Sequence, residues 1–402
     1  MILKETLRNI IKSQRENLIN PEKFLERELL PEIDRKSQHA VILSGIRRCG
    51  KSTLLLELMQ TLNNYYYFNF EDPRSINLEV TDFEKMDQIF HEDFGESTSY
   101  FFDEIQNVPE WERFVRMLQD QGKKVYITGS NASLLSRELG TRLTGRHLSY
   151  ELFPFSFNEM AGYLGKDPNL STFEEYMQNG GFPEYLKFHN TDILHQLFRD
   201  IISRDIITRY KIREHRILID LAIHLLTNSG NEFTFNRLKN QFNLGSTNTA
   251  ISYLSYLEES YLLFTIPKFD YSFAKQRSHA KKVYSIDPGL SRANTASLSP
   301  DRGRILENIV LLELFRQKKK VFYLKNNFEC DFIVQQKNQI TEACQVCYEL
   351  TEENMQREMA GLQHAKNLTG AQSGFILTYN QEDEINGVPV LPVWKWCLSR
   401  NL

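Results

Sequence analysis

The stretch at residues 45–53, Gly-Ile-Arg-Arg-Cys-Gly-Lys-Ser-Thr, constrains this chain more than any other. An apolar segment (40–43) precedes it and a run of good helix formers (53–62) follows, which predicts a strand, a glycine loop and a helix. The two glycines allow successive N–H groups to point at a polyphosphate, and the helix N-terminus adds its positive end. The stretch therefore predicts a phosphate-binding loop for ATP or GTP, made of Gly45, Ile46, Arg47, Arg48, Cys49, Gly50, Lys51, Ser52 and Thr53.

Side chains of this loop and of a later strand have distinct expected roles. Lys51 is expected to reach the β- and γ-phosphates, and the Ser52 hydroxyl to hold Mg²⁺. A second apolar strand at 100–102 runs into Asp103 and Glu104. We expect Asp103 to hold the Mg²⁺ through its water shell and Glu104 to polarise the attacking water. Because an Asp-Glu pair alone is also typical of a helix start or a solvated loop, this prediction depends on its pairing with the glycine loop.

Predicted strands alternate with helical segments over residues 39–152, which favours a parallel, doubly wound sheet. The predicted strands are 40–43, 65–70, 100–102, 124–128 and 148–152. The fourth strand ends in a polar cluster that includes Asn131, at the carboxyl edge where ligands of such sheets bind. Asn131 is expected either to contact the γ-phosphate or the attacking water, or to cap the helix that follows.

Length and composition narrow the class of protein. A chain of 402 residues is too long for one hydrophobic core, which predicts several domains. Its 41% hydrophobic and 25% charged residues and its net charge of −4 are typical of a soluble globular protein. Five scattered cysteines favour a reducing compartment, so we expect a cytoplasmic protein. No segment approaches the roughly 18 apolar residues of a membrane span, and we expect no membrane partner.

The glycine loop and the Asp103-Glu104 pair belong to a longer set of motifs that resembles the predicted AAA+ ATPases of bacteria and archaea. The matching segments lie at 45–52, 102–106, 128–130, 145–146 and 152–157, and continue at 180–184, 284–290, 306–308 and 329–332. They extend over nearly the whole chain. The resemblance implies an α/β P-loop ATPase that uses ATP and Mg²⁺, then a helical and winged-helix region, then a C-terminal α/β domain of the restriction-endonuclease-like fold.

This resemblance also implies a domain organisation and an assembly. The expected parts are an N-terminal helical extension (1–38), an AAA+ ATPase domain (39–157), a helical lid or spacer (158–230), a winged-helix domain (231–290) and a nuclease-like domain (291–402). The family resemblance implies a homo-oligomer whose active site is completed by an arginine of a neighbouring subunit. Arg142 or Arg146 would fill that role, and the alternative for each is a pairing with a surface carboxylate.

Charge is unevenly distributed in the second half of the chain. Residues 266–320 hold twelve Lys and Arg against five Asp and Glu, with aromatic residues interleaved. This pattern favours nonspecific contact with a DNA backbone, although a solvated face balanced by acids elsewhere gives the same pattern. The predicted second helix of the winged helix (249–259) has no Lys or Arg, so base reading by that helix is not expected. The DNA-contact candidates are Lys268, Lys275, Arg277, Lys281 and Lys282.

The last domain carries an altered version of a nuclease site. Glu307, Asp331 and Gln345 match, position by position, the acidic site of restriction-endonuclease-like folds. Such sites need carboxylates for Mg²⁺ and a lysine two residues after the third position, where this chain has Cys347. We therefore expect a degenerate nuclease fold kept for binding. A weak nuclease that uses Lys325 or Glu349 instead is the alternative.

The sequence thus predicts an ATP-hydrolysing protein that couples its nucleotide state to a DNA-binding, nuclease-like domain. Two alternatives stay open. One is an ATP-gated switch or scaffold that binds a protein partner, and the other is an active Mg²⁺-dependent nuclease controlled by ATP. Stimulation of ATP turnover by DNA would distinguish the DNA-binding ATPase from the protein-binding switch. Plasmid cleavage that Asp331→Ala abolishes would establish the nuclease.

Overall fold

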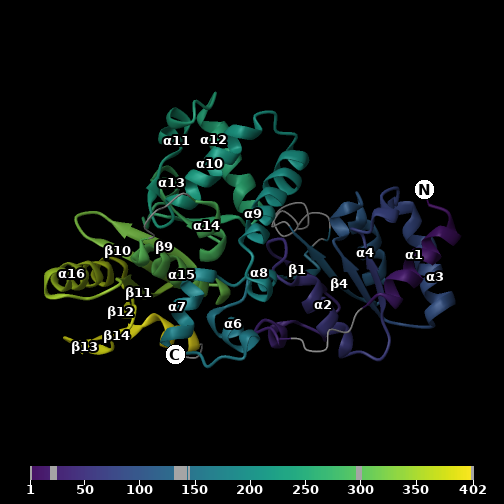
Figure 1. The fold of residues 1–402 in the computed structure, drawn as a ribbon, viewed down its shortest axis with the longest axis horizontal. Helices are drawn as coiled ribbons and strands as arrows, with labels where there is room; N and C mark the ends of the chain where they lie inside the picture. The colour runs from purple at the N-terminus through teal and green to yellow at the C-terminus, as the bar shows by residue number, and fades with distance from the viewer. Residues whose placement is uncertain (1, 19–24, 131–142, 144, 296–300, 400–402) are drawn as a thin grey trace. The chain divides into compact units, whose positions relative to one another are not determined.

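The computed structural model describes residues 2–18, 25–130, 143, 145–295 and 301–399. The chain divides into two compact units, Met1–Leu152 and Phe153–Leu402 (Figure 1). The first unit ends five residues before the predicted end of the ATPase domain at 157. All three regions predicted beyond residue 157 fall in the second unit, and the boundaries between them stay predictions.

A parallel sheet of five strands forms the centre of the first unit, in the order β2-β3-β4-β1-β5. Its strands are β1 (Ala40–Ser44), β2 (Tyr66–Asn69), β3 (Ser99–Asp103), β4 (Lys124–Gly129) and β5 (His147–Glu151). Every residue of β1 and β3 is buried, as expected for central strands of a parallel sheet covered on both faces. The five strands that the sequence predicts are present, within one or two residues at their ends.

Helices cover the two faces of this sheet. One face packs its alternate strand residues, such as Ile42, Phe68, Phe102 and Ile127, into one hydrophobic cluster with α1, α3 and α4. The other face contacts α2 through β3 and β4. The helices are α1 (Lys4–Glu16), α2 (Lys51–Gln60), α3 (Phe83–Phe94) and α4 (Trp111–Asp120), with short 3-10 turns at Leu30–Glu32, Pro73–Ser75, Val80–Asp82 and Ile105–Asn107. This layering brings the carboxyl ends of β1, β3 and β4 to one edge, where the predicted site residues lie.

The second unit begins with a helical region. Its helices are α6 (Phe157–Leu164), α7 (Leu170–Asn179), α8 (Pro183–Phe188), α9 (Thr191–Asp200), a π-helix (Ile201–Thr208) and α10 (His215–Thr227). Ser156 and Glu159 form a capping box that fixes the start of α6, with hydrogen bonds of 3.1 and 2.9 Å. The predicted continuous helix at 194–210 is thus an α-helix that changes into a π-helix.

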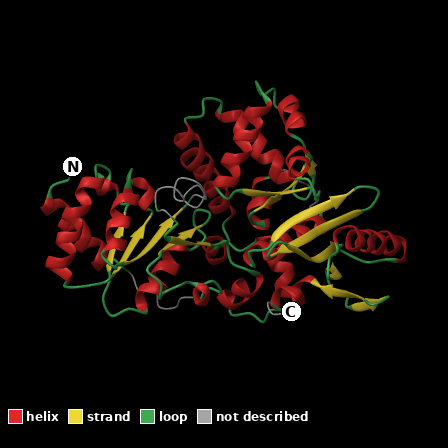
Figure 2. Cartoon of the chain, turned by 180° about the vertical axis from the view of Figure 1, so that it is seen from behind, coloured by secondary structure: helices red, strands yellow, loops and turns green. Residues whose placement is uncertain are grey.

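Two sheets follow in the second unit (Figure 2). A small antiparallel sheet has the order β6-β8-β7 and is accompanied by helices α11 and α12. A larger mixed sheet has the order β13-β14-β12-β11-β10-β9, and α16 packs on its strands β10, β11 and β12. The elements are β6 (Glu232–Phe233), α11 (Phe235–Gln241), α12 (Thr247–Glu259), β7 (Leu263–Pro267), α13 (Phe273–Ser278), β8 (Lys281–Ser285), α14 (Pro288–Asn294), α15 (Arg302–Arg316), β9 (Lys320–Lys325), β10 (Glu329–Gln336), β11 (Gln339–Val346), α16 (Glu352–Thr369), β12 (Ser373–Thr378), β13 (Asp383–Ile385), β14 (Val388–Pro392) and α17 (Val393–Leu398).

The chain also meets the expectation of a separate C-terminal α/β sheet domain. Its order of helix, three strands, helix and strand, from α15 to β12, agrees with the order predicted for residues 300–380. Among the described residues, no helix has both the length and the apolar character needed to cross a lipid bilayer.

Candidate functional site

The loop between β1 and α2 has a backbone that requires glycine. Gly45 has a φ of +152° and Gly50 a φ of +101°, both in the range that L side chains rarely adopt. A Cβ on Gly45 would lie 2.1 Å from the carbonyl oxygen of Leu152. The helix α2 begins directly after the loop, at Lys51. The predicted arrangement of strand, glycine loop and helix is therefore present, with the helix N-terminus at the loop.

Two contacts hold the loop against its own unit. The Arg27 guanidinium donates a hydrogen bond to the Cys49 carbonyl oxygen at 2.8 Å, and Arg27 is buried. The Cys49 thiol, which has no exposed surface, lies 3.3 Å from the carbonyl oxygen of Leu152, and burial raises its pKa. The Leu152 amide in turn donates to Ser44 at the end of β1. Arg27 belongs to no sequence motif, and no local pattern in the sequence indicates its role.

Lys51 and Glu104 face each other across the loop. The Lys51 ammonium donates to the carbonyl oxygens of Gly45 and Ile46, both at 3.0 Å, and lies 3.9 Å from the Glu104 carboxylate. Glu104 has a left-handed backbone (φ +53°) directly after β3, and the Gln106 amide donates to its carboxylate. Two of the predicted catalytic side chains therefore converge on the glycine loop.

Asp103 is the buried carboxylate of this site. The Thr128 hydroxyl at the end of β4 donates to Asp103 and accepts a hydrogen bond from the Glu104 amide at 3.0 Å. Burial and then the charge of the nearby Asp103 raise the pKa of the Tyr67 hydroxyl. Burial and then the charge of Glu104 raise the pKa of Asp103 to about 6, against the opposing effect of Thr128, Ser52 and Lys51. A buried carboxylate beside a serine hydroxyl is a donor set that suits Mg²⁺, because hard cations prefer oxygen ligands.

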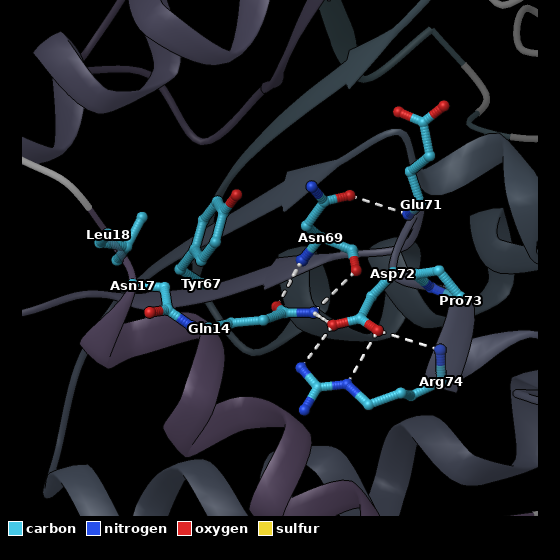
Figure 3. A pocket seen from close by; sticks show the side chains of 9 residues that line it. All are labelled: Gln14, Asn17, Leu18, Tyr67, Asn69, Glu71, Asp72, Pro73 and Arg74. Carbon is cyan, nitrogen blue, oxygen red and sulfur yellow. Dashed lines mark hydrogen bonds and ion pairs between the residues drawn. The ribbon is translucent and has the colours of Figure 1, made fainter.

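A polar pocket of about 530 Å³ lies at the edge strand β2 (Figure 3). Gln14 donates to the Asn69 carbonyl oxygen at 3.0 Å and to the Asp72 carboxylate at 3.2 Å, and the Arg74 guanidinium also holds Asp72. The hydrogen bond from Arg74 lowers the pKa of Asp72 to about 2. The pocket adjoins the glycine loop, because its lining residue Glu71 pairs with Arg47 of the loop at 3.0 Å.

The other predicted residues of the first unit have varied positions. Ile46 is buried, whereas Arg48, Ser52 and Thr53 are exposed. Arg146 pairs with Asp120 at 2.5 Å, and both side chains are more than half exposed. Asn131 and Arg142 lie outside the described residues.

The second unit brings Glu307, Asp331 and Gln345 together from α15, β10 and β11. The Gln345 side-chain oxygen accepts a hydrogen bond from the Asp331 amide at 3.3 Å. Lys282 on β8 lies between the acids, with its ammonium 3.0 Å from Glu307 and 3.1 Å from Asp331. Burial and then the charge of Asp331 raise the pKa of Glu307 to about 7. Cys347 follows β11, and burial raises its pKa to about 12.

This placement corrects the expectation that Lys282 contacts DNA, because its ammonium is buried in ion pairs. The other candidates lie closer to solvent. Lys275 and Arg277 are exposed on α13, and Lys268 and Lys281 are half-buried. Two aromatic side chains beside them are also exposed, Tyr271 at 75% and Phe273 at 71%. We call Tyr271, Phe273, Lys275 and Arg277 the aromatic-cationic patch.

Comparison with known proteins places the first unit in a class. The model of the AAA domain matches residues 37–161, and a domain of unknown function (DUF8612) matches residues 170–301. Together with the parallel five-stranded sheet and the glycine loop, the AAA match makes this an AAA+-type P-loop ATPase fold, as predicted. Neither of these two matches indicates a nuclease-like C-terminal domain.

The chain belongs to the same family as the uncharacterized protein MJ1544 of Methanocaldococcus jannaschii. The two are 33% identical over 394 residues, which cover 89% of this chain and 88% of the relative. An uncharacterized protein of Haemophilus influenzae is 29% identical over 385 residues, which cover 89% of this chain and 94% of that protein.

Solved structures that match this chain have lower sequence identity. AMPPCP-bound DnaA from Aquifex aeolicus is 13% identical with a TM-score of 0.32, over 60% of this chain and 93% of that chain. The Aeropyrum pernix ORC1 protein in complex with DNA is 13% identical with a TM-score of 0.32, over 73% of this chain and 92% of that chain.

Proposed function

We propose that this protein hydrolyses ATP in its first unit and couples the nucleotide state to DNA binding by its second unit. The observation that carries the proposal is the convergence of Lys51, Asp103 and Glu104 at the glycine loop, at the carboxyl edge of a parallel sheet. Two acids at that edge and one buried lysine in the loop are the groups that phosphoryl transfer from a nucleoside triphosphate requires.

Each of these side chains has a defined task. The Lys51 ammonium, now on two loop carbonyls, donates to the β- and γ-phosphates when they occupy the loop. Ser52 and Asp103 would hold Mg²⁺, which would neutralise charge on the phosphate oxygens. Glu104 orients the attacking water and accepts a proton from it. Thr128 fixes Asp103 and the Glu104 backbone at once, so that both acids keep one geometry.

The proposed active form is a homo-oligomer in which an arginine of one subunit reaches the nucleotide of the next. Arg146 is a candidate because its ion pair with Asp120 is exposed, and exposed pairs contribute about 0–1 kcal/mol. Release of Arg146 from this ion pair therefore costs little free energy. We expect Arg146→Ala to lower turnover at protein concentrations that support assembly. Arg113→Ala, which removes another exposed and paired arginine, is the matched control. Equal turnover of the Arg146 variant and the parent at every protein concentration would remove Arg146 from the site.

The proposed DNA contact is the aromatic-cationic patch. Exposed rings offer stacking surfaces for bases, and Lys275 and Arg277 offer charge for phosphates. The helix α12 has no Lys or Arg, which favours contact with the backbone over reading of base edges. The same feature of α12, together with Ile251 at 43% exposed, favours the second candidate function, an ATP-gated switch that binds a protein partner through this helix.

The deciding experiment is steady-state ATP hydrolysis at low salt, with and without single- and double-stranded DNA, using Glu104→Gln as the blank. We expect DNA to stimulate turnover, and we expect the double variant Lys275→Ser/Arg277→Ser to lose that stimulation. Lys187→Ser/Lys395→Ser removes the same charge from other exposed positions and serves as the control. ATP turnover that does not change when DNA is added would favour the protein-binding switch. Absence of any turnover above the blank would overturn the ATPase assignment itself.

A further inference from the structure

Lys282 has surroundings that an ordinary surface lysine never has. Its side chain is 4% exposed, and its ammonium lies 3.0 Å from Glu307, 3.1 Å from Asp331 and 3.3 Å from Glu329. The three acids come from α15 and β10, whereas Lys282 comes from β8 of the small sheet. One buried cation therefore links three carboxylates on two other elements.

Two of these acids are the pair that the family resemblance assigns to a divalent cation. Direct Mg²⁺ ligation needs oxygens at about 2.0–2.1 Å from the ion. Here the position between Glu307 and Asp331 holds a nitrogen at ordinary ion-pair distances, and it is attached to the chain. A divalent ion would have to displace a buried, paired ammonium. With Lys282 between Glu307 and Asp331, the site does not fit a metal ion.

Further hydrogen bonds hold the carboxylates of Glu307 and Asp331. The Tyr284 hydroxyl donates to Glu307 at 2.6 Å, and the Val346 amide donates to the second oxygen of Asp331 at 3.0 Å. Gln345, at the position of the third ligand, accepts from the Asp331 amide and donates to the Glu358 carboxylate. The hydrogen-bond network is therefore organised around the lysine. No group of three or more His, Cys, Asp or Glu among the described residues is arranged to hold a metal ion.

We propose that Lys282 is the resident cation of this site, in place of the divalent ion of nuclease-like folds. Its ammonium balances Glu307 and Asp331 and ties the small sheet to the C-terminal sheet without a metal. Removal of this one charge, by Lys282→Met, converts the three carboxylates into a site for a divalent cation. The inference is independent of ATP hydrolysis and opposes the reading of the second unit as an active Mg²⁺ nuclease.

Mn²⁺ binding tests the proposal directly. The full-length chain carries Asp103→Asn in every sample, without nucleotide, so that the first unit contributes no metal site. Binding is measured by calorimetry and by the electron paramagnetic resonance signal of free Mn²⁺ at pH 8, where protons compete little for the carboxylates. We expect the Lys282→Met variant to gain one Mn²⁺ site at least tenfold tighter than any binding by the parent.

Two matched variants make the gain specific. Lys282→Arg keeps the charge and gains no site, and Lys282→Met/Asp331→Asn loses the gained site. A folded Lys282→Met variant without a new Mn²⁺ site would overturn the proposal. Mn²⁺ binding by the parent that Asp331→Asn abolishes would also overturn it, because the lysine would then yield its place to the ion and the nuclease reading would gain support.

A second measurement covers the case in which Lys282→Met does not fold. Crystals of the chain with native Lys282 are soaked in Mn²⁺, and the anomalous scattering of manganese is mapped. We expect no peak between Glu307 and Asp331. A peak there, at any Mn²⁺ concentration that the crystals survive, would show that the position accepts a metal and that Lys282 is not its cation.

Discussion

The hydroxyl of Thr128 donates a hydrogen bond to the buried carboxylate of Asp103. The same oxygen accepts from the Glu104 amide at 3.0 Å, so that one side chain on β4 fixes both acids at the end of β3. Thr128 has no exposed surface. The relationship makes Thr128 a positioning residue for the proposed reaction.

Thr128→Val tests this role, because valine has nearly the same shape and no hydroxyl. Loss of a hydrogen bond to a buried charged group costs about 1.5–3 kcal/mol, so we expect kcat for ATP to fall about 10- to 100-fold. We expect the nucleotide Kd to change little, because Thr128 contacts the acids rather than the loop. Thr128→Ser keeps the hydroxyl and is expected to restore most of the rate. A Kd that rises while kcat stays constant would contradict the positioning role.

The raised pKa of Asp103 predicts how pH affects stability without nucleotide. The folded-state pKa of about 6 exceeds the ordinary value of 3.8, because burial and Glu104 oppose ionisation. The folded state therefore binds the proton more tightly, and the ionised form of Asp103 destabilises the fold above about pH 6. This penalty declines as pH falls through 6 and is absent below about pH 4. A shift of this size corresponds to about 3 kcal/mol at most.

Asp103→Asn removes the ionisable group and should thus stabilise the nucleotide-free first unit at pH 8 by about 2–3 kcal/mol, with no gain at pH 4. Urea unfolding followed by Trp111 fluorescence measures the difference. Trp394 and Trp396, the other two tryptophans, are replaced by phenylalanine in both samples. A gain of equal size at both pH values would show that the effect does not come from ionisation.

Gly45→Ala should abolish nucleotide binding. The new Cβ would lie 2.1 Å from the Leu152 carbonyl oxygen, and the φ of +152° disfavours any L side chain. The loop must then move, which misaligns its N–H groups. Gly245→Ala is the control, because a Cβ there meets nothing within 4 Å. Binding of a fluorescent ATP analogue measures both variants, and an unchanged Kd for Gly45→Ala would mean that the loop has room to adjust.

Arg27→Met should weaken nucleotide binding without removing it. The variant keeps much of the side-chain volume but leaves the Cys49 carbonyl without its donor at 2.8 Å. Loss of this hydrogen bond is expected to weaken the free energy of nucleotide binding by about 1–2 kcal/mol. This corresponds to a rise of about 5- to 30-fold in Kd. Arg35→Met, at an exposed position, is the matched control. Equal Kd values for the two variants would exclude Arg27 from loop positioning.

Local patterns were enough to predict the strands, the glycine loop and the Asp103-Glu104 pair, because periodicity and turn chemistry act over a few residues. They did not identify Arg27, which contacts the glycine loop from a segment without any motif, or Tyr67, whose hydroxyl lies near Asp103. Lys282 illustrates the limit most clearly. A count of charges along residues 266–320 cannot distinguish a lysine at the surface from one buried between acids that are 25 and 49 residues away in sequence. Local patterns likewise did not distinguish the π-helix at Ile201–Thr208 from the α-helix before it.

Leu152 is the last residue of the first unit, and the chain enters the second unit at Phe153. Its carbonyl oxygen is also the wall against which Gly45 packs and to which the Cys49 thiol is held at 3.3 Å. The glycine loop thus packs against the last residue of its own unit. A shift of the loop must either break these contacts or displace the peptide bond that follows Leu152. Movement of the glycine loop would therefore act directly on the peptide that joins Leu152 to Phe153.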